Sequence, residues 1–204
     1  MSYINNIHIK PSSPAEADTA AKLCFMAYHK FSYDIFGQIG EEAAIERFKQ
    51  LWLHGNNRFG YRFSYTAEIN NKAVAIMTCY PSPQIKKLAA PTLWYLTRIG
   101  KLPFILHLIS HLPNFYYFAN DQEFPACEFY LATLSVLPEY RSMGIGAKML
   151  QHARKLSRDL NLQNCSLHVT AENEGGIRFY ERNGFKKAPP QYKSPTYFKM
   201  VNPH

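Results

Sequence analysis

The chain has 204 residues, of which 47% are apolar and 19% are charged. This balance excludes a disordered chain and suits a single domain over residues 1–204 with one substantial core. A membrane span is also excluded, because the longest apolar stretch, residues 102–112, contains Pro103, His107 and Ser110. A span needs roughly 20 consecutive apolar residues, so we expect no membrane partner.

The net charge of +8 is concentrated in the last third of the chain. From Glu139 onward, 11 Lys and Arg residues stand against 5 Asp and Glu, whereas the first 138 residues carry 12 against 10. This excess predicts an anionic partner near the last third. The cations are dispersed and no RNA-binding aromatic motif is present, so we do not expect nucleic acid.

The four cysteines are widely spaced, with no CxxC pair, and the first residues show no export signal. A disulfide framework or a zinc site would need tighter clustering. We therefore expect reduced thiols in a cytoplasmic protein, and no metal.

The first half of the chain predicts an edge strand, two helices and a hairpin. The strand begins at Ile4 and ends at Pro11, and a helix follows with Ser13 as N-cap, Pro14 at its first position and Glu16 at its third. This helix is expected to reach about Lys30. A second helix is predicted over 41–53, and strands over 61–69 and 73–80 flank a turn at 70–72.

Residues 84–126 are rich in Leu, Ile, Phe and Tyr and are interrupted by prolines. They predict one or two short helices bent at Gly100 and Pro103, followed by the aromatic run 115–118. Three roles are open for this segment: a lid or wall of the pocket that would receive a substrate, a dimer contact, or additional core.

The last third alternates strands and helices. Strands are predicted over 128–136, 166–170 and 197–201, and helices over 144–160 and 175–183. The order of elements along the whole chain indicates one mixed α/β sheet.

The most informative segment joins a strand to a helix through Val136, Pro138, Arg141, Gly144 and Gly146. Two glycines let the backbone turn tightly and approach a ligand without a Cβ in the way. The unpaired N–H groups at the helix start form an anion site, and the guanidinium of Arg141 suits a pyrophosphate. Neither a dinucleotide fingerprint nor a P-loop fits these residues.

The spacing Val136-x-Pro138-x-x-Arg141-x-x-Gly144-x-Gly146 resembles the Arg/Gln-x-x-Gly-x-Gly/Ala motif of the GNAT superfamily of N-acetyltransferases. A second element follows at the expected distance. Leu167-x-Val169-x-x-x-Asn173, and then Phe179-Tyr180-Glu-Arg-Asn-Gly184-Phe185, are similar to the family's fifth strand, its Asn and its "FYEKxGF" helix. The resemblance covers residues 128–187.

The resemblance implies an α/β (α+β) fold: a mixed, mostly antiparallel central sheet flanked by helices, with a helical insertion between the third and fourth strands. It also implies that residues 128–187 form an acetyl-CoA-binding core. Acetyl-CoA would be a co-substrate, held by Leu134, Ser135, Val136, Arg141, Ser142, Met143, Gly144, Ile145, Gly146, Ala147, Asn173 and Tyr180. The N–H groups of 141–146 would hold the pyrophosphate, and the edge at Leu134 and Val136 would pair with the pantetheine.

Two residues are candidates for proton transfer. Tyr180 matches the family's tyrosine near the sulfur, and a phenol stays protonated at neutral pH. Glu128 is a candidate general base, since alternation places it on the face shared by Tyr130, Leu134 and Val136. The commoner base position of the family is occupied here by Tyr130, and His168 has the parity opposite to Val169.

Together these features predict an N-acetyltransferase that moves an acetyl group from acetyl-CoA to a primary amine of a small molecule or peptide, by direct attack in a ternary complex. No cysteine occupies a motif position, which disfavours an acyl-enzyme. An apolar lid would favour an acceptor with an apolar or aromatic body, and the protein would be a monomer or homodimer. The alternative is a non-catalytic module that binds acyl-CoA.

Overall fold

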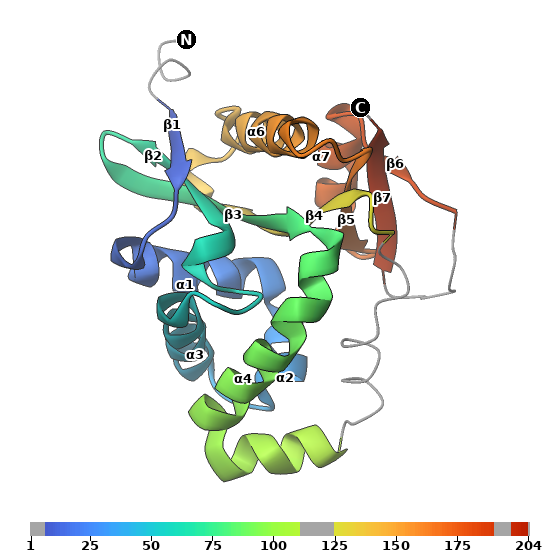
Figure 1. The fold of residues 1–204 in the computed structure, drawn as a ribbon. Coiled ribbons are helices and arrows are strands. Elements are labelled where there is room, and N and C mark those ends of the chain that lie inside the picture. The colour runs from blue at the N-terminus through green and yellow to red at the C-terminus, as the bar shows by residue number, and fades with distance from the viewer. Residues whose placement is uncertain (1–6, 111–124, 190–196, 204) are drawn as a thin grey trace.

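The computed structural model describes residues 7–110, 125–189 and 197–203. A central sheet separates two layers of helices, with α6 and α7 on one face and α1 to α4 on the other (Figure 1). This is the mixed, mostly antiparallel α/β arrangement predicted from the sequence. Within the described residues, no helix is long and apolar enough to cross a membrane.

The described strands form a seven-stranded sheet in the order β1-β2-β3-β4-β5-β7-β6. Among their pairings only β4–β5 is parallel. The strands are β1 (His8–Pro11), β2 (Ser64–Ile69), β3 (Lys72–Pro81), β4 (Glu128–Val136), β5 (Asn164–Thr170), β6 (Lys186–Lys187) and β7 (Tyr197–Pro203). The predicted hairpin is β2–β3, and Asn70 and Asn71 at its turn both have positive φ (51° and 60°).

The helices mostly lie where the sequence predicts them. They are α1 (Ala17–Tyr28), α2 (Lys30–Phe36), α3 (Glu41–His54), α4 (Ser82–Ser110), α6 (Ile145–Asp159) and α7 (Glu174–Arg182), with 3-10 turns over Pro14–Glu16, Tyr61–Phe63 and Pro138–Tyr140. The first helix ends at Tyr28, close to the predicted end at about Lys30, but α2 is not among the predicted helices. His29 has φ 28° and ψ −103°, which ends α1 and lets α2 leave in a new direction.

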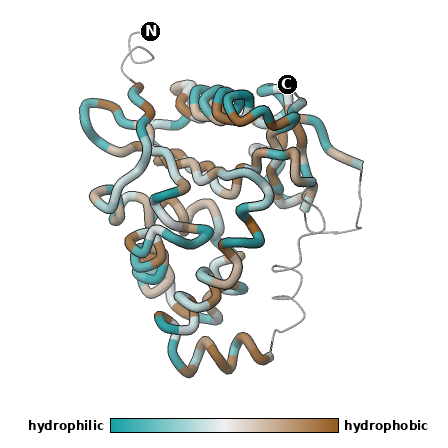
Figure 2. Tube along the Cα trace, in the orientation of Figure 1, coloured by the Kyte–Doolittle hydropathy of each residue, from teal (hydrophilic) through white to brown (hydrophobic). Residues whose placement is uncertain are grey.

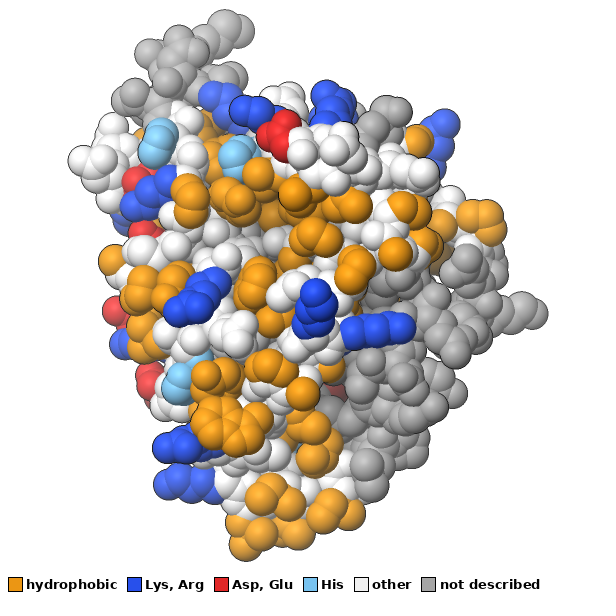
Figure 3. Space-filling view, in the orientation of Figure 1, with side chains coloured by type: hydrophobic (Ala, Val, Ile, Leu, Met, Phe, Trp, Pro, Cys, Tyr) orange, Lys and Arg blue, Asp and Glu red, His pale blue; other side chains and the backbone are white. Residues whose placement is uncertain are grey.

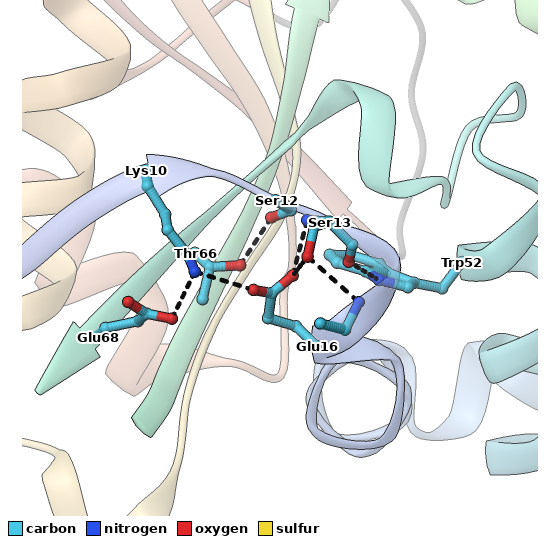
Figure 4. Close-up of polar contacts among 8 residues, drawn as sticks. Lys10, Ser12, Ser13, Glu16, Trp52, Thr66 and Glu68 are labelled. Carbon is cyan, nitrogen blue, oxygen red and sulfur yellow. Dashed lines mark hydrogen bonds and ion pairs between the residues drawn. The ribbon is translucent and has the colours of Figure 1, made fainter. Parts of the chain in front are cut away.

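The predicted cap at the first helix is confirmed, and it ties the helix to the sheet (Figure 4). The Glu16 carboxylate accepts from the Ser13 backbone N–H (2.6 Å) and from its hydroxyl (2.7 Å). Lys10 of β1 bridges Glu16 (3.1 Å) and Glu68 of β2 (2.7 Å). The indole of Trp52 on α3 donates to the Ser13 carbonyl (3.0 Å). One buried carboxylate therefore joins two strands to the first helix.

Each face of the sheet has its own apolar core, and apolar segments line the interior of the ribbon (Figure 2). The core toward α6 and α7 contains alternate residues of β3 and β5 together with Ile145, Met149 and Ile177. The core toward α1 to α4 contains Phe48, Trp52 and further aromatic residues. The site described below lies between these two cores.

The described part of the predicted insertion is α4, which bends at Lys101 (φ 52°, ψ −149°), close to the expected Gly100 and Pro103. Its Leu96 and Phe104 are buried in the core with α1 and α3. This half of the segment therefore adds to the core, as one of the three roles predicted. The aromatic run 115–118 lies outside the described residues.

We expect Glu16→Gln to lower the free energy of unfolding by about 1 kcal/mol at pH 7. Burial raises the pKa of Glu16, but the hydrogen bonds from Ser13 and the charge of Lys10 outweigh it, so the net pKa is lowered. A lowered pKa stabilises the fold above the ordinary value near 4.3, and this stabilisation disappears as the pH falls through the folded-state pKa. Chemical unfolding at pH 7 and below pH 4 measures both values.

Glu139→Gln is the matched control, because Glu139 is exposed. If Glu16→Gln lost as much stability at low pH as at pH 7, the charge of Glu16 would not be the source of the effect.

Candidate active site

The parallel strands β4 and β5 pair only along part of their length. Their register runs from Glu128 opposite Asn164 to Leu131 opposite Leu167, and there the pairing ends. Both strands continue, to Val136 and to Thr170. On its other edge, β4 pairs with β3 over Phe129 to Val136. Beyond Leu131, the β5-facing edge of β4 therefore pairs with no described strand, and its backbone groups can accept an extended ligand.

A β-bulge marks the point where the strands part. Thr78 pairs with Thr133 and Cys79 with Leu131, which leaves Ala132 as the extra residue. The hydroxyl of Tyr28, at the end of α1, lies 3.1 Å from the Ala132 carbonyl, to which it donates, and 2.8 Å from the Thr133 hydroxyl. Burial raises the pKa of Tyr28, which keeps this phenol protonated as a donor. The α1 helix thus holds the bulge in place.

The bulge reverses the alternation of β4, which corrects the predicted placement of Glu128. Before the bulge, Phe129 and Leu131 face α6; after it, Leu134 and Val136 do. Tyr130 and Ala132 pack instead against residues of α4 on the opposite face. Glu128 alternates with Phe129, so it shares the face of Tyr130 but not that of Leu134 and Val136. One inserted residue moves a side chain to the other side of the sheet.

The predicted anion site lies at the start of α6. The first described helical bond runs from the Lys148 N–H to the Gly144 carbonyl (3.0 Å), so the N–H groups of Ile145, Gly146 and Ala147 have no partner within the helix. No side chain caps this helix, and its first turn contains no acid. These donors and the positive end of the helix dipole remain available to an anion.

The two glycines of the motif have different roles. Gly144 has φ 77°, and a Cβ there would meet nothing within 4 Å, so it provides the tight turn and an open approach as predicted. Glycine suits position 146 for a different reason, because a Cβ there would lie 2.9 Å from Cζ of Phe179. Gly146 therefore lets α6 pack closely against α7. Ser142 also has positive φ (62°).

The remaining predicted cofactor contacts surround this turn. Leu134 and Val136 are half-buried on the α6 face, and Met143 and Tyr140 pack on the same core. Ser135 is buried on the opposite face. The Nε of Arg141 donates to the Val136 carbonyl (3.2 Å), which places its exposed guanidinium beside the end of β4. The structure thus gathers these residues, apart from Ser135, on one side of the parted strands.

Asn173 and Tyr180 are brought in by α7. The Asn173 side chain caps this helix by accepting from the Gly176 N–H (2.8 Å). The Tyr180 ring packs edge-on against Phe179 and Phe185, with centroids 5.2 and 5.8 Å away. Burial raises the pKa of its hydroxyl to about 12, and no described residue hydrogen-bonds that hydroxyl. Tyr180 is therefore a protonated donor on the α6–α7 face.

On the other face, Tyr130 and His168 meet across the strands where the pairing ends. The Tyr130 hydroxyl lies 3.4 Å from Nδ1 of His168. Tyr197 of β7 packs on His168 (centroids 6.3 Å apart) and on Phe31 of α2 (5.5 Å). Sequence reasoning noted Tyr130 and His168 but did not join them. In the parallel register Tyr130 lies opposite Ser166, two residues before His168, so knowledge of that register would have placed Tyr130 and His168 on one face of the sheet.

Glu128 lies further along the same face. Its carboxylate pairs with Lys199 of β7 at 3.0 Å, and both side chains are largely buried. Glu128 is three residues before Leu131, which is roughly 10 Å along a strand. The structure thus places Tyr130 and His168, rather than Glu128, next to the point where β4 and β5 part.

No group of three or more His, Cys, Asp or Glu among the described residues is arranged to hold a metal ion. The cysteines are free, with Cys24, Cys79 and Cys165 buried. The polar groups next to the parted strands include the Tyr130 phenol, the His168 imidazole and backbone N–H groups.

Comparison with known proteins agrees with this geometry. Residues 114–185 match the model of the acetyltransferase (GNAT) family. The N-alpha-acetyltransferase 50 of Danio rerio is 37% identical over 75 residues, which are 36% of this chain and 43% of that protein. The chain thus matches less than half of the relative's length. Over residues 114–185 the chain thus matches the acetyltransferase (GNAT) family, which confirms the resemblance inferred from the two sequence motifs.

Solved structures extend the similarity of fold to nearly the whole chain. An N-acetyltransferase from Staphylococcus aureus Mu50 superposes with a TM-score of 0.72 at 17% identity, over 95% of this chain and 99% of that one. The PaiA N-acetyltransferase of Thermoplasma acidophilum, solved in complex with coenzyme A, superposes with a TM-score of 0.57 at 17% identity, over 97% and 99%. At these identities the likeness shows the fold.

We expect Gly146→Ala to lower the free energy of unfolding by about 1–3 kcal/mol, because the new methyl group displaces the Phe179 ring and separates α6 from α7. The matched control is Gly175→Ala in the first turn of α7, where a Cβ would meet nothing within 4 Å. That variant should gain about 0.4–1 kcal/mol. Equal stability of the two variants in chemical unfolding would contradict the assignment of Gly146 to helix packing.

Proposed function

We propose that the protein transfers an acetyl group from acetyl-CoA to a primary amine of a small molecule or peptide, by direct attack in a ternary complex. The observation that carries this proposal is the end of β4–β5 pairing at Leu131 and Leu167, beside the uncapped start of α6. An extended pantetheine can pair with the unpaired edge of β4 while its pyrophosphate binds the α6 N-terminus. The N-acetyltransferase names of the relatives also support it.

The basic last third is consistent with such a cofactor. Coenzyme A carries a pyrophosphate and a ribose phosphate, and Arg141 stands beside the α6 start. The Lys72 ammonium lies 5.8 Å from the ring centroid of Tyr140, which directly precedes Arg141. Lys72 therefore adds a cation near the loop before α6. The cofactor would therefore lie on the α6–α7 face, with its thioester reaching the gap between the strands.

The reaction needs a neutral amine, a polarised carbonyl and a stabilised leaving thiolate. The amine nitrogen attacks the carbonyl carbon, a C–N bond forms and the C–S bond breaks. A backbone N–H of β4 facing the carbonyl oxygen would contribute roughly 2.7–4 kcal/mol to stabilising the transition state. The negative charge then passes to the sulfur.

Tyr180 is the proposed donor to that sulfur. Its pKa of about 12 exceeds the value of about 8.5 for an ordinary thiol, so complete transfer of its proton to a thiolate would be unfavourable. A hydrogen bond from the protonated phenol to the sulfur is available at neutral pH, because burial keeps the Tyr180 hydroxyl protonated. Tyr180 therefore stabilises the departing thiolate as a donor, and solvent supplies any proton that the thiolate finally takes.

The proton of the amine leaves on the opposite face. An alkylammonium has a pKa near 10, so the proton must be removed for attack. We propose that Tyr130 and His168 accept this proton, directly or through water, because they flank the end of the strand pairing. Glu128 is further away and is ion-paired with Lys199, so we assign it to the surroundings of the amine substrate.

The face of the sheet that carries Tyr130 and His168 favours a substrate with a single amine and an apolar or aromatic body. Phe31, Tyr80, Tyr130 and Tyr197 contribute rings to this face. The carboxylates nearby are already paired, Glu128 with Lys199 and Glu172 with Lys30. Among the described residues this face therefore offers little unpaired negative charge to a polycation.

We expect Tyr180→Phe to lower kcat roughly 10²–10³-fold while leaving the affinity for acetyl-CoA unchanged, because one donor to the transition state is removed. Free thiol release over a panel of primary amines, and calorimetric titration of each variant, measure the two quantities. Tyr65→Phe is the matched control, since Tyr65 lies on β2 and its ring packs against His152.

In the same assay, Tyr130→Phe should retain more of its rate at high pH, where more of the free amine is already neutral. No thiol release with any amine, together with tight binding of acetyl-CoA, would contradict the transfer reaction and leave a non-catalytic acyl-CoA-binding module.

A further inference from the structure

After its bend at Lys101, α4 presents an exposed apolar face. The inner face buries Ile85, Leu88, Leu96 and Phe104. After the bend at Lys101, the outer face carries an apolar stripe with helical spacing, of residues that are 64, 39, 58 and 60% exposed: Leu102, Ile105, Leu106 and Ile109. Before the bend, Trp94 is 54% exposed. A helix that needed only to add to the core would present polar residues here.

The charge of α4 has one sign. The helix contains Lys86, Lys87, Arg98 and Lys101 and no Asp or Glu. All four cations are exposed, and none is ion-paired with an acid of the described residues. Arg98 lies over the Trp94 ring, 5.3 Å from its centroid. Arg98 and Lys101 thus border the apolar stripe, whereas Lys86 and Lys87 lie near the start of α4.

The stripe lies on a protruding part of the molecule. After the bend, α4 forms the lower end of the ribbon in Figure 1, away from the β4–β5 site. Figure 3 shows apolar side chains gathered at this end, with Lys and Arg side chains at one side. A protruding apolar surface can insert into a lipid bilayer, whereas the capture of a peptide requires a groove.

We infer that α4 docks the protein on the surface of an anionic lipid bilayer. The part of α4 after the bend would lie in the interface, with the apolar stripe in the acyl boundary and the neighbouring cations Arg98 and Lys101 on the headgroups. Apolar residues, an interfacial Trp and flanking Lys and Arg are the features of helices that bind in this way. The expectation of no membrane partner rested on the absence of a span, and interfacial binding needs none.

A second copy of the chain is a poorer occupant. A two-fold contact through the stripe would bring the cations of one α4 close to those of the other. Like charges repel at such a contact, whereas an anionic surface attracts the Arg98 and Lys101 side chains. The charge of the helix therefore selects the lipid surface, and this inference does not depend on the proposed acetyl transfer.

The test is co-sedimentation of the full chain with phosphatidylcholine vesicles, with and without phosphatidylserine. We expect binding to the anionic vesicles that weakens as salt is raised. Leu102→Ser with Leu106→Ser, and separately Arg98→Gln with Lys101→Gln, should each lower the partition coefficient roughly tenfold or more. These four side chains are exposed, so the variants should fold, which circular dichroism checks.

The matched controls are Leu160→Ser and Lys22→Gln, which change exposed residues outside α4 and should leave the partition coefficient unchanged. Absence of binding to anionic vesicles would overturn the inference, as would equal binding of the α4 variants and the unchanged chain. Light scattering supplies a further outcome. A dimer that both α4 variants dissociate would overturn the inference in favour of a contact between copies.

Discussion

The parting of β4 and β5 is the constraint on which the rest of the site depends. Two parallel strands that pair as far as Leu131 and Leu167 and then separate leave backbone groups without partners in the middle of a sheet. Such groups are costly to bury unless something hydrogen-bonds them. An extended ligand can do so, and the sheet thereby becomes a binding surface. The bulge at Ala132 and the hydroxyl of Tyr28 fix where the parting begins.

The same parting joins two faces that the sheet otherwise keeps separate. Tyr180 and the start of α6 belong to one face, whereas Tyr130 and His168 belong to the other. In the proposed reaction, a thioester reaching the gap from the first face would meet an amine arriving from the second. The proposed donor to the leaving group and the proposed acceptor of the amine proton would then stand on opposite sides of the reacting carbon. This arrangement explains why the two proposed proton-handling groups do not contact each other.

Local chemistry predicted most of the fold. The cap at Ser13 and Glu16, the turn at Asn70 and Asn71, and the strand–turn–helix motif at Gly144 depend on neighbouring residues, so the sequence reveals them. The short helix α2 was not predicted, because it follows α1 after one residue and no proline or glycine separates the two helices.

Features that depend on distant residues could not be predicted in the same way. The bulge at Ala132 is held by Tyr28, over a hundred positions earlier, and it moved Glu128 to the other face. The packing of Gly146 on Phe179 and the ion pair of Glu128 with Lys199 are likewise visible only once the helices and strands are assembled. Alternation along one strand cannot reveal them.

Calorimetric titration with acetyl-CoA, and with dephospho-CoA as comparison, tests the central claim most directly. If the parted strands and the α6 N-terminus bind the cofactor, acetyl-CoA should bind 1:1 and saturably in the micromolar range. Dephospho-CoA should bind more weakly, because it lacks one phosphate that the basic last third attracts. Absence of binding at millimolar acetyl-CoA would contradict the account, and the parted strands would then need another ligand.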